Sequence, residues 1–248
     1  MSLALMLAAG AASTTDVPIC TDRPAKANAV CTVPKGRLQL ETSLANWSLT
    51  KAGETKTRTL SLGSSFLKYG LTDRSDLQIG FTPWVRVTGG TSGLGDIVIR
   101  FKQRLTGDDA PVQFALIPFV KLPTAPRGIG NRRTEGGLAG AISTSVGAAT
   151  VTLGPELDLL ADSDGHGTHL ALINLVNVSG PIAPRLTIGG ELWTNRNFDP
   201  AGTVKQASAD ASIAYALSTT AQLDAGTNLG LTKETADVEL YAGFSLRF

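Results

Sequence analysis

The sequence predicts an all-β protein, a transmembrane antiparallel up-and-down β-barrel of about twelve strands. Three observations lead to this prediction. Apolar and polar residues alternate in consecutive runs from residue 36 onward, the connections between runs are alternately long and short, and charged residues near mid-run stand opposite the aliphatic ones. Because successive side chains of a strand point to opposite faces, each run has one apolar and one polar face.

The runs follow one another without a convincing helical period. They cover residues 36–49, 57–69, 75–87, 95–105, 111–122, 137–147, 149–160, 168–178, 184–194, 204–217, 220–230 and 236–248. Runs of about 11–13 residues that rise about 3.3 Å per residue and tilt by about 40° project to roughly 28–33 Å, enough to cross a membrane. Strands of soluble proteins average nearer about 5–6 residues.

Two of the first three runs are irregular. The first and third change phase near Trp47 and Trp84. A β-bulge restores the phase after such a change, and bulges are common at barrel rims. We therefore expect a bulge in both runs.

The fourth to seventh runs place ionisable residues opposite aliphatic ones. In the fourth run Ile97, Ile99 and Phe101 oppose three cations, and in the fifth Lys121 opposes Phe114. The three cations of the fourth run are Arg100, Lys102 and Arg104. In the seventh run, the leucines oppose the acidic residues Glu156 and Asp158.

The later runs repeat this arrangement, with one exception. The eighth run is apolar on both faces, so we expect it to pack against something inside the barrel. The ninth, tenth and eleventh runs carry Glu191, Asp210 and Asp224 on the polar face. The last run carries Asp237, Glu239 and Arg247 opposite a row that ends at Phe248.

A charged residue on a lipid-facing position at mid-depth would cost about 2–4 kcal/mol, whereas it costs little in a wet lumen. We therefore predict that the polar faces line the lumen, with cations and anions paired; the alternative for any single residue is a solvated charge with no role in selectivity. The predicted lumen-lining residues are Arg100, Lys102, Arg104, Lys121, Glu156, Asp158, Glu191, Asp210, Asp224, Asp237, Glu239 and Arg247.

The connections predict the orientation of the barrel. The odd-numbered ones are usually long and the even-numbered ones usually short. In bacterial outer-membrane barrels the long loops face outside and the short turns face the periplasm. An even number of strands then leaves both termini in the periplasm.

Composition and the N-terminus predict an exported protein that does not bind nucleic acid. The chain has 248 residues, a formal net charge of +1 and 27 glycines, so it lacks the basic surface of a nucleic-acid-binding protein. Residues 1–12 resemble a signal peptide that lacks a basic start, which indicates a truncated beginning. Residues 13–35 are expected in the periplasm and residues 36–248 in the barrel. In an oxidising compartment Cys20 and Cys31 would form a disulfide, the alternative being two free thiols.

Two polar loops could carry other functions. The histidines, His166 and His169, lie close to Asp162, Ser163 and Asp164. This loop would suit a catalytic Ser–His pair or a cation site only if the side chains meet, and a solvated loop is the simpler interpretation. The arginines of the longest connection, Arg127, Arg132 and Arg133, could meet anionic solutes or lipopolysaccharide phosphates, although a solvated loop again explains them.

Six segments in order resemble one family of transporter barrels, the phenol-degradation meta-pathway family of outer-membrane proteins. They are DRP at 22–24, VPKG, KYGLTDRSDLQIG, GLGDIVIRFKQRL, ALIPFVKLPT and LDAGTNLGLTKETADVELYAGFSLRF. The resemblance implies a barrel in the outer membrane of a Gram-negative bacterium that passes small compounds, such as aromatic ones. In such barrels the assembly machinery reads a terminal aromatic residue on the last strand, and Phe248 resembles this signal. The Cys20–Cys31 pair is not part of the family pattern.

We therefore expect a channel for small, aromatic or hydrophobic solutes, with outer-membrane lipids and lipopolysaccharide around it. A barrel of this size has a narrow lumen, which the N-terminal segment or the longest loop could partly plug. No covalent chemistry, cofactor or metal is predicted. The alternative is a lipid-modifying enzyme or a structural barrel without conductance.

Overall fold

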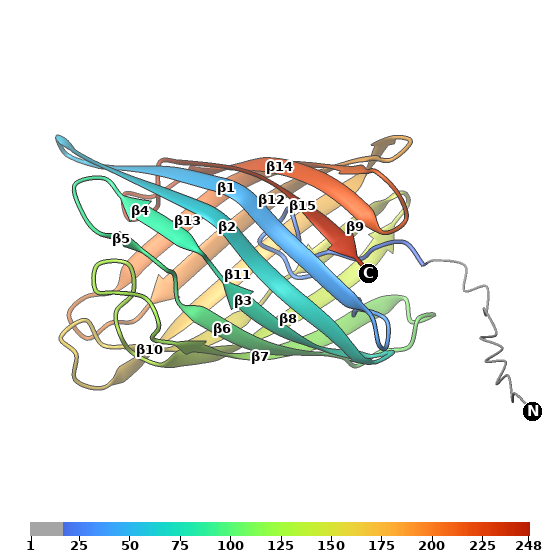
Figure 1. The fold of residues 1–248 in the computed structure, drawn as a ribbon, viewed down its shortest axis with the longest axis horizontal. Coiled ribbons are helices and arrows are strands. Elements are labelled where there is room, and N and C mark those ends of the chain that lie inside the picture. The colour runs from blue at the N-terminus through green and yellow to red at the C-terminus, as the bar shows by residue number, and fades with distance from the viewer. Residues whose placement is uncertain (1–16) are drawn as a thin grey trace, which may run out of the picture.

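A closed antiparallel barrel accounts for the chain from residue 36 onward (Figure 1). The computed structural model describes residues 17–248, so the predicted signal peptide, residues 1–12, lies outside the described residues. Within the described range no helix is long and apolar enough to cross a membrane. The barrel closes because the first strand pairs with both the second and the last, with Gln39 opposite Arg247.

The strands follow the predicted runs closely. Their bounds are β1 Leu38–Ala52, β2 Thr55–Thr72, β3 Ser75–Phe81, β4 Trp84–Val87, β5 Ser92–Gly93, β6 Ile97–Arg104, β7 Val112–Leu122, β8 Glu135–Val146, β9 Ala149–Leu153, β10 Glu156–Ala161, β11 Thr168–Ala183, β12 Leu186–Asn197, β13 Val204–Ala216, β14 Ala221–Gly230 and β15 Val238–Arg247. Three of the segments that span the barrel are each split into two strands. These pairs are β3 with β4, β5 with β6, and β9 with β10. The prediction of about twelve crossings is therefore confirmed.

Prolines cause two of the interruptions. Pro83 separates β3 from β4 and Pro155 separates β9 from β10. Proline has no N–H to donate to a ladder, so it stops regular pairing. The facing strands carry glycines at these points: a Cβ on Gly63 would lie 3.3 Å from the Pro83 ring, and one on Gly140 would lie 3.2 Å from the Pro155 ring.

The phase changes predicted near Trp47 and Trp84 are present, displaced by a few residues. In β1 the pairing with β15 shifts between Ser43 and Ala45, and the other change is the interruption before Trp84. After these points Trp47 faces Leu60 of β2, and Trp84 faces Leu62, on the outer surface.

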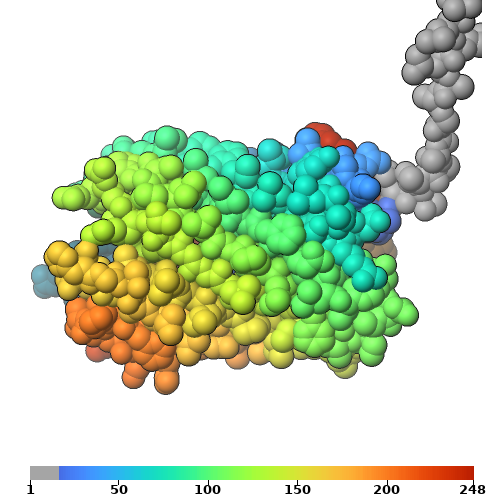
Figure 2. Space-filling view, turned by 90° about the horizontal axis from the view of Figure 1, so that it is seen from below, coloured from blue at the N-terminus to red at the C-terminus, as the bar shows by residue number. Residues whose placement is uncertain are grey.

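Burial in this barrel is the reverse of that in a soluble protein. Among the largest described side chains that are under 2% exposed, the only aliphatic one is Ile117; the others are Lys102, Gln39, Gln78, Asp76, Ser208 and Ser245. The outer surface instead exposes large apolar residues on all sides, for example Leu157, Leu192 and Leu240. Figure 2 shows consecutive segments side by side round this surface. The apolar face therefore points outward, as a surface in contact with lipid requires.

The eighth run, now β11, alternates between inward and outward residues. Its buried positions include His169, Ala171 and Leu175, while Leu170 and Leu172 are exposed on the outside. Leu175 lies against the gap between β9 and β10, because a Cβ on Gly154 would come within 2.8 Å of its Cγ. The inner apolar side chain thus covers the interruption at Pro155.

The two ends of the barrel differ. Short turns such as residues 147–148 and 184–185 lie at one end, and the longest connection, residues 123–134, lies at the other. The first odd-numbered connection was predicted to be long, but it contains only residues 53 and 54 because β1 and β2 extend further than expected. Phe248 donates its backbone N–H to Leu38, so the C-terminus lies at the short-turn end (Figure 1).

Candidate functional site

Residues 17–35, here called the inner loop, enter the barrel from the short-turn end and lie in the lumen (Figure 1). At the entrance the Ile19 N–H donates to Thr219 at 2.7 Å. A disulfide joins Cys20 to Cys31, with the Cα atoms 6.2 Å apart, and so brings the two arms of the loop together. The loop then meets β1 after Lys35.

The composition of the inner loop suits a polar lumen. Small alanines allow the backbone to approach wall carboxylates, and the N–H of Ala27 donates to Glu191 Oε2 at 2.9 Å. The aliphatic residues stay on one side, where Val30 packs with Ala115 and Ala141 of the wall. The loop is therefore held mainly by polar and charged contacts.

Asp22 forms the first of three anchors. Its carboxylate accepts hydrogen bonds from Lys102 Nζ at 2.6 Å and from Lys68 Nζ at 2.5 Å, and Lys68 also pairs with Glu41. Within the loop, the Ala29 N–H donates to the same carboxylate at 2.8 Å. Lys102 is 1% exposed, so its charge depends on Asp22 for compensation.

Burial raises the pKa of Asp22, but Lys102 and Lys68 outweigh burial and hold that pKa well below its usual range. A carboxyl whose pKa is lowered in the folded state stabilises that state above its unfolded pKa, and this contribution disappears only as the pH falls through the folded pKa. The Asp22 anchor therefore persists at neutral and mildly acidic pH.

Arg23 forms the second anchor, which reaches β14 and β1. Its guanidinium donates to both oxygens of Asp224, at 2.5 and 3.2 Å, and to Ser43 Oγ at 2.8 Å. The Asp224 side chain is fully buried. Removing one partner of such a pair leaves an uncompensated buried charge, which costs about 3–5 kcal/mol.

Lys26 forms the third anchor. Its Nζ donates to Asp210 and to Ser208, each at 2.7 Å, and lies 4.7 Å from the centre of the Trp193 ring. The backbone N–H of Lys26 donates to Glu191 at 3.2 Å. Strands β12 and β13 thus hold the tip of the loop through charge-assisted bonds, which are stronger than neutral ones.

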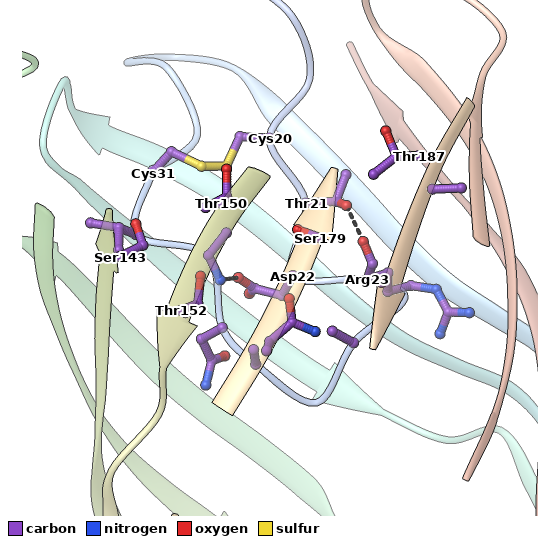
Figure 3. A pocket seen from close by; sticks show the side chains of 18 of the residues that line it. Cys20, Thr21, Asp22, Arg23, Cys31, Ser143, Thr150, Thr152, Ser179 and Thr187 are labelled. Atoms are coloured by element: carbon purple, nitrogen blue, oxygen red, sulfur yellow. Dashed lines mark hydrogen bonds between the residues drawn. A yellow bond between two sulfur atoms is a disulfide. The ribbon is translucent and has the colours of Figure 1, made fainter. Parts of the chain in front are cut away.

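Two cavities lie beside the inner loop. The larger, about 550 Å³, extends toward the short turns and is walled by hydroxyl and amide side chains such as Thr150, Ser179 and Gln222 (Figure 3). The smaller, about 390 Å³, lies against β1, β2, β3 and β6 and includes Phe66 and Arg100. The inner loop stands between the two cavities, because both are bordered by residues 22, 23, 25 and 28.

The structure divides the predicted lumen-lining residues into two groups. The first group contacts the inner loop and consists of Arg100, Lys102, Glu191, Asp210, Asp224 and Arg247. Arg100 Nη1 donates to Asn28 at 3.4 Å, and its guanidinium lies 4.3 Å from the centre of the Phe66 ring. Arg247 donates to the Val17 carbonyl.

The second group makes contacts within the wall or at its rims. Lys121 pairs with Glu135 at 2.8 Å, Arg104 pairs with Asp108 in the turn after β6, and Glu239 accepts from Asn46. Glu156 borders the smaller cavity and Asp158 is buried. Asp237 is exposed, precedes β15 and accepts from the Lys51 N–H.

Sequence reasoning missed several members of this network. Glu41 lies in the irregular first run, where the phase change hid the inward face, and Lys68 lies in the second run. Asp22 and Arg23 are part of the DRP motif, but their partners lie up to 201 residues away along the chain. Alternation within β2, with Lys68 opposite Leu67 and Tyr69, could have identified Lys68.

The histidine loop does not assemble a catalytic triad in the described chain. His169 Nδ1 lies 2.8 Å from Asp162, but Ser163 Oγ donates to Asp199 at 3.1 Å instead of meeting a histidine. His166 contacts Asp164 through its backbone N–H. Among residues 17–248 no cluster of three or more histidine, cysteine or acidic side chains could hold a metal ion.

A closed antiparallel barrel with an apolar outside and a charged inside is the architecture of transmembrane β-barrel proteins. The chain belongs to the family described as "Putative MetA-pathway of phenol degradation", whose model matches residues 21–248. No curated protein matches the sequence.

Three solved structures share the fold. An outer membrane channel from Pseudomonas putida F1 has a TM-score of 0.71 at 16% identity, covering 91% of this chain and all of that one (100%). The NanC porin has a TM-score of 0.55 at 9% identity, covering 84% of this chain and 98% of its own. The translocator domain of the autotransporter NalP from Neisseria meningitidis has a TM-score of 0.53 at 12% identity, covering 87% and 90%.

Proposed function

We propose that this protein is an outer-membrane channel for small solutes that rests in a closed state, with the inner loop as its plug. The observation that carries the proposal is the pair of cavities inside one closed barrel, separated by a loop that charged groups hold in place. A structural barrel would need neither the cavities nor a segment that can move between them. The likeness to a solved outer membrane channel supports the same function.

The orientation follows from the two unlike ends of the barrel. The long connections face the outside of the cell and the short turns face the periplasm, as in other outer-membrane barrels. Both termini, and the entrance of the inner loop, are then periplasmic. Phe248, which is 60% exposed at this end, serves as the recognition signal for the barrel-assembly machinery. Outer-membrane lipids cover the apolar surface, and lipopolysaccharide surrounds the outer rim.

The cavity walls favour small solutes that carry hydroxyl or carboxylate groups. Threonine, serine and glutamine side chains offer hydrogen bonds in the larger cavity, and in the smaller one Arg100 and Phe66 together offer a charge and an aromatic face. These groups suit aromatic acids and phenols. The family description, which refers to phenol degradation, agrees with this class.

A lipid-modifying enzyme is the other candidate, and the geometry gives it little support. Such an enzyme needs a nucleophile activated by a base, whereas Ser163 of the histidine loop bonds to Asp199. We therefore propose no catalytic role for the histidine loop.

Recording in planar lipid bilayers tests the proposal. We expect the purified protein to give brief unitary openings, and the variant R23Q/K26Q to stay open longer, because it loses two anchors that lie in the loop and not in the barrel wall. Benzoate should reduce the open-channel current of this variant more than acetate does.

The matched control is R74Q/R185Q, which also removes two positive charges but alters exposed residues in the short turns, outside the inner loop. This control should give the same unitary openings in the bilayer as the wild type. If neither the wild type nor R23Q/K26Q conducts while both are folded, the channel proposal is wrong; esterase activity in the same samples would favour the enzyme instead.

A further inference from the structure

Four cations gather on the outer surface at the long-loop end of β1, β2 and β4. They are Lys51, Lys56, Arg58 and Arg86, here called the rim patch. Lys51 stands directly opposite Lys56, and Arg86 stands opposite Leu60, two positions from Arg58 on the same face of β2. Adjacent strands lie about 4.8 Å apart, so the four side chains share one small area.

The register shows that the rim patch faces away from the lumen. Leu60 pairs with Trp47 as well as with Arg86, and Leu62, which is 39% exposed, lies on the same face. The intervening Ser61 pairs with Asn46, which lines the smaller cavity. The cations therefore continue the lipid-facing surface beyond its last apolar residues.

The positive charge of the rim patch is not compensated within the described chain. All four residues are exposed, and in residues 17–248 none of their side chains has an acidic partner within 4.0 Å. The nearest acidic residues along the chain and the ladder are Glu54, at the tip of the turn, and Asp237, which accepts the Lys51 backbone N–H. By contrast, Lys68 and Lys102 inside the lumen are both paired.

The position of the patch relative to the apolar surface defines what it can meet. Trp47 and Trp84 face outward just below the cations, and tryptophan is enriched where the apolar layer of a membrane meets its polar surface. The cations therefore stand at the depth of lipid head groups and not in open solvent. Neighbouring cations at that depth attract phosphate, and arginine can bind it with two parallel hydrogen bonds.

We infer that the rim patch is a binding site for a phosphorylated glycolipid of the outer leaflet, of the lipid A type. Its acyl chains would lie on the apolar surface below Trp47 and Trp84, and its sugar phosphates would contact Lys56, Arg58 and Arg86. A smaller pair on the other side of the barrel, Arg196 opposite Lys205, would take further phosphates. The inference rests on the proposed orientation, with the long loops outside.

Lipid retention by the detergent-purified full chain tests the inference, with native mass spectrometry as the readout. The probes are bisphosphorylated lipid A and the same lipid without its phosphates. We expect the wild type to retain the bisphosphorylated form at least about tenfold better, and R58Q/R86Q to bind it about tenfold more weakly, since each surface cation contributes appreciably to the attraction. Raising the salt concentration should weaken the wild-type binding.

The control variant R74Q/R185Q loses the same charge at the short-turn end and should bind lipid A like the wild type. Equal binding by R58Q/R86Q and the control, or equal retention of both lipids by the wild type, would overturn the inference. R58Q/R86Q should keep the wild-type bilayer current, since neither residue borders a cavity. If the protein binds lipid A but never conducts, the inferred lipid site therefore stands and only the channel proposal is contradicted.

Discussion

At the residue scale, Arg100 is the lumenal cation best placed to act on a passing solute. Lys102 and Arg104 were predicted to line the lumen with it, but Lys102 pairs with Asp22 and Arg104 pairs with Asp108. Arg100 instead lies over Phe66 and borders the smaller cavity, with an Asn28 contact of 3.4 Å. Its charge is the least neutralised of the three.

We therefore expect Arg100→Gln to shift the reversal potential of the open channel toward cation selectivity, since a fixed positive charge beside the path favours anions. The measurement is the reversal potential in a salt gradient, in the R23Q/K26Q background so that the channel is open. Arg58→Gln is the control, because it removes the same charge from the outer surface and borders neither cavity. An unchanged potential in Arg100→Gln would show that this side chain lies away from the path.

The inward direction of such residues could be predicted from alternation, but their partners could not. Alternation placed Asp224, Asp210 and Glu191 on the polar face of regular strands. Their partners, Arg23 and Lys26, lie about 160–200 residues away in a segment without periodicity, a separation that a pattern with a period of two cannot bridge. The Cys pair, by contrast, suggested a closed loop through its short spacing and the predicted export.

At the scale of elements, the inner loop is short and has few apolar contacts, so its position depends on the disulfide as well as on its three anchors. Without the Cys20–Cys31 bond the two arms of the loop would gain conformational freedom. Its apolar support is limited to a cluster around Val30.

We expect C20S/C31S to fold into the same barrel but to open more often in bilayers than the wild type, because the undocked loop gains entropy. Hydrogen exchange of residues 20–31 should also be faster while the strands stay protected. Treatment of the wild type with a reducing agent serves as an independent comparison. Unchanged open probability and exchange in C20S/C31S would mean that the charged anchors alone fix the loop.

The interruptions of the strands illustrate a second limit of sequence reasoning. Pro83 and Pro155 lie inside runs that were predicted to be continuous, and the structure splits both. The facing glycines, Gly63 and Gly140, make space for the proline rings, but only the register shows that they stand opposite. A cross-strand relation of this kind depends on tertiary pairing and not on local propensity.

At the scale of the whole molecule, the apolar exterior explains why the overall fold was predictable. Nearly every run contributes one outward apolar row, and this signal is repeated around the barrel. Repetition compensates for the weak signal of each single strand. The contents of the lumen lack such repetition. The sequence therefore predicted a plug but could not decide whether the N-terminal segment or the longest loop forms it.

We expect Leu192→Arg to lower the free energy of unfolding in lipid vesicles by about 2–4 kcal/mol, because a charge at mid-depth must enter the apolar layer. Leu231→Arg, at the outer rim, should cost only about 0–1 kcal/mol. The two leucines are almost equally exposed, at 60% and 61%, so exposure alone cannot explain a difference. The measurement is reversible denaturant unfolding; equal losses would contradict a lipid-facing surface.

The inner loop also joins the two sides of the place where the barrel closes. Asp22 is bonded to β2 and β6, while Arg23 and Lys26 are bonded to β14 and β13, and the closing pair of strands, β1 and β15, lies between these two sets. The segment that obstructs the passage is thus also an internal tie across the final junction. During biogenesis, insertion of this segment and zipping of the last strand onto the first should therefore assist each other.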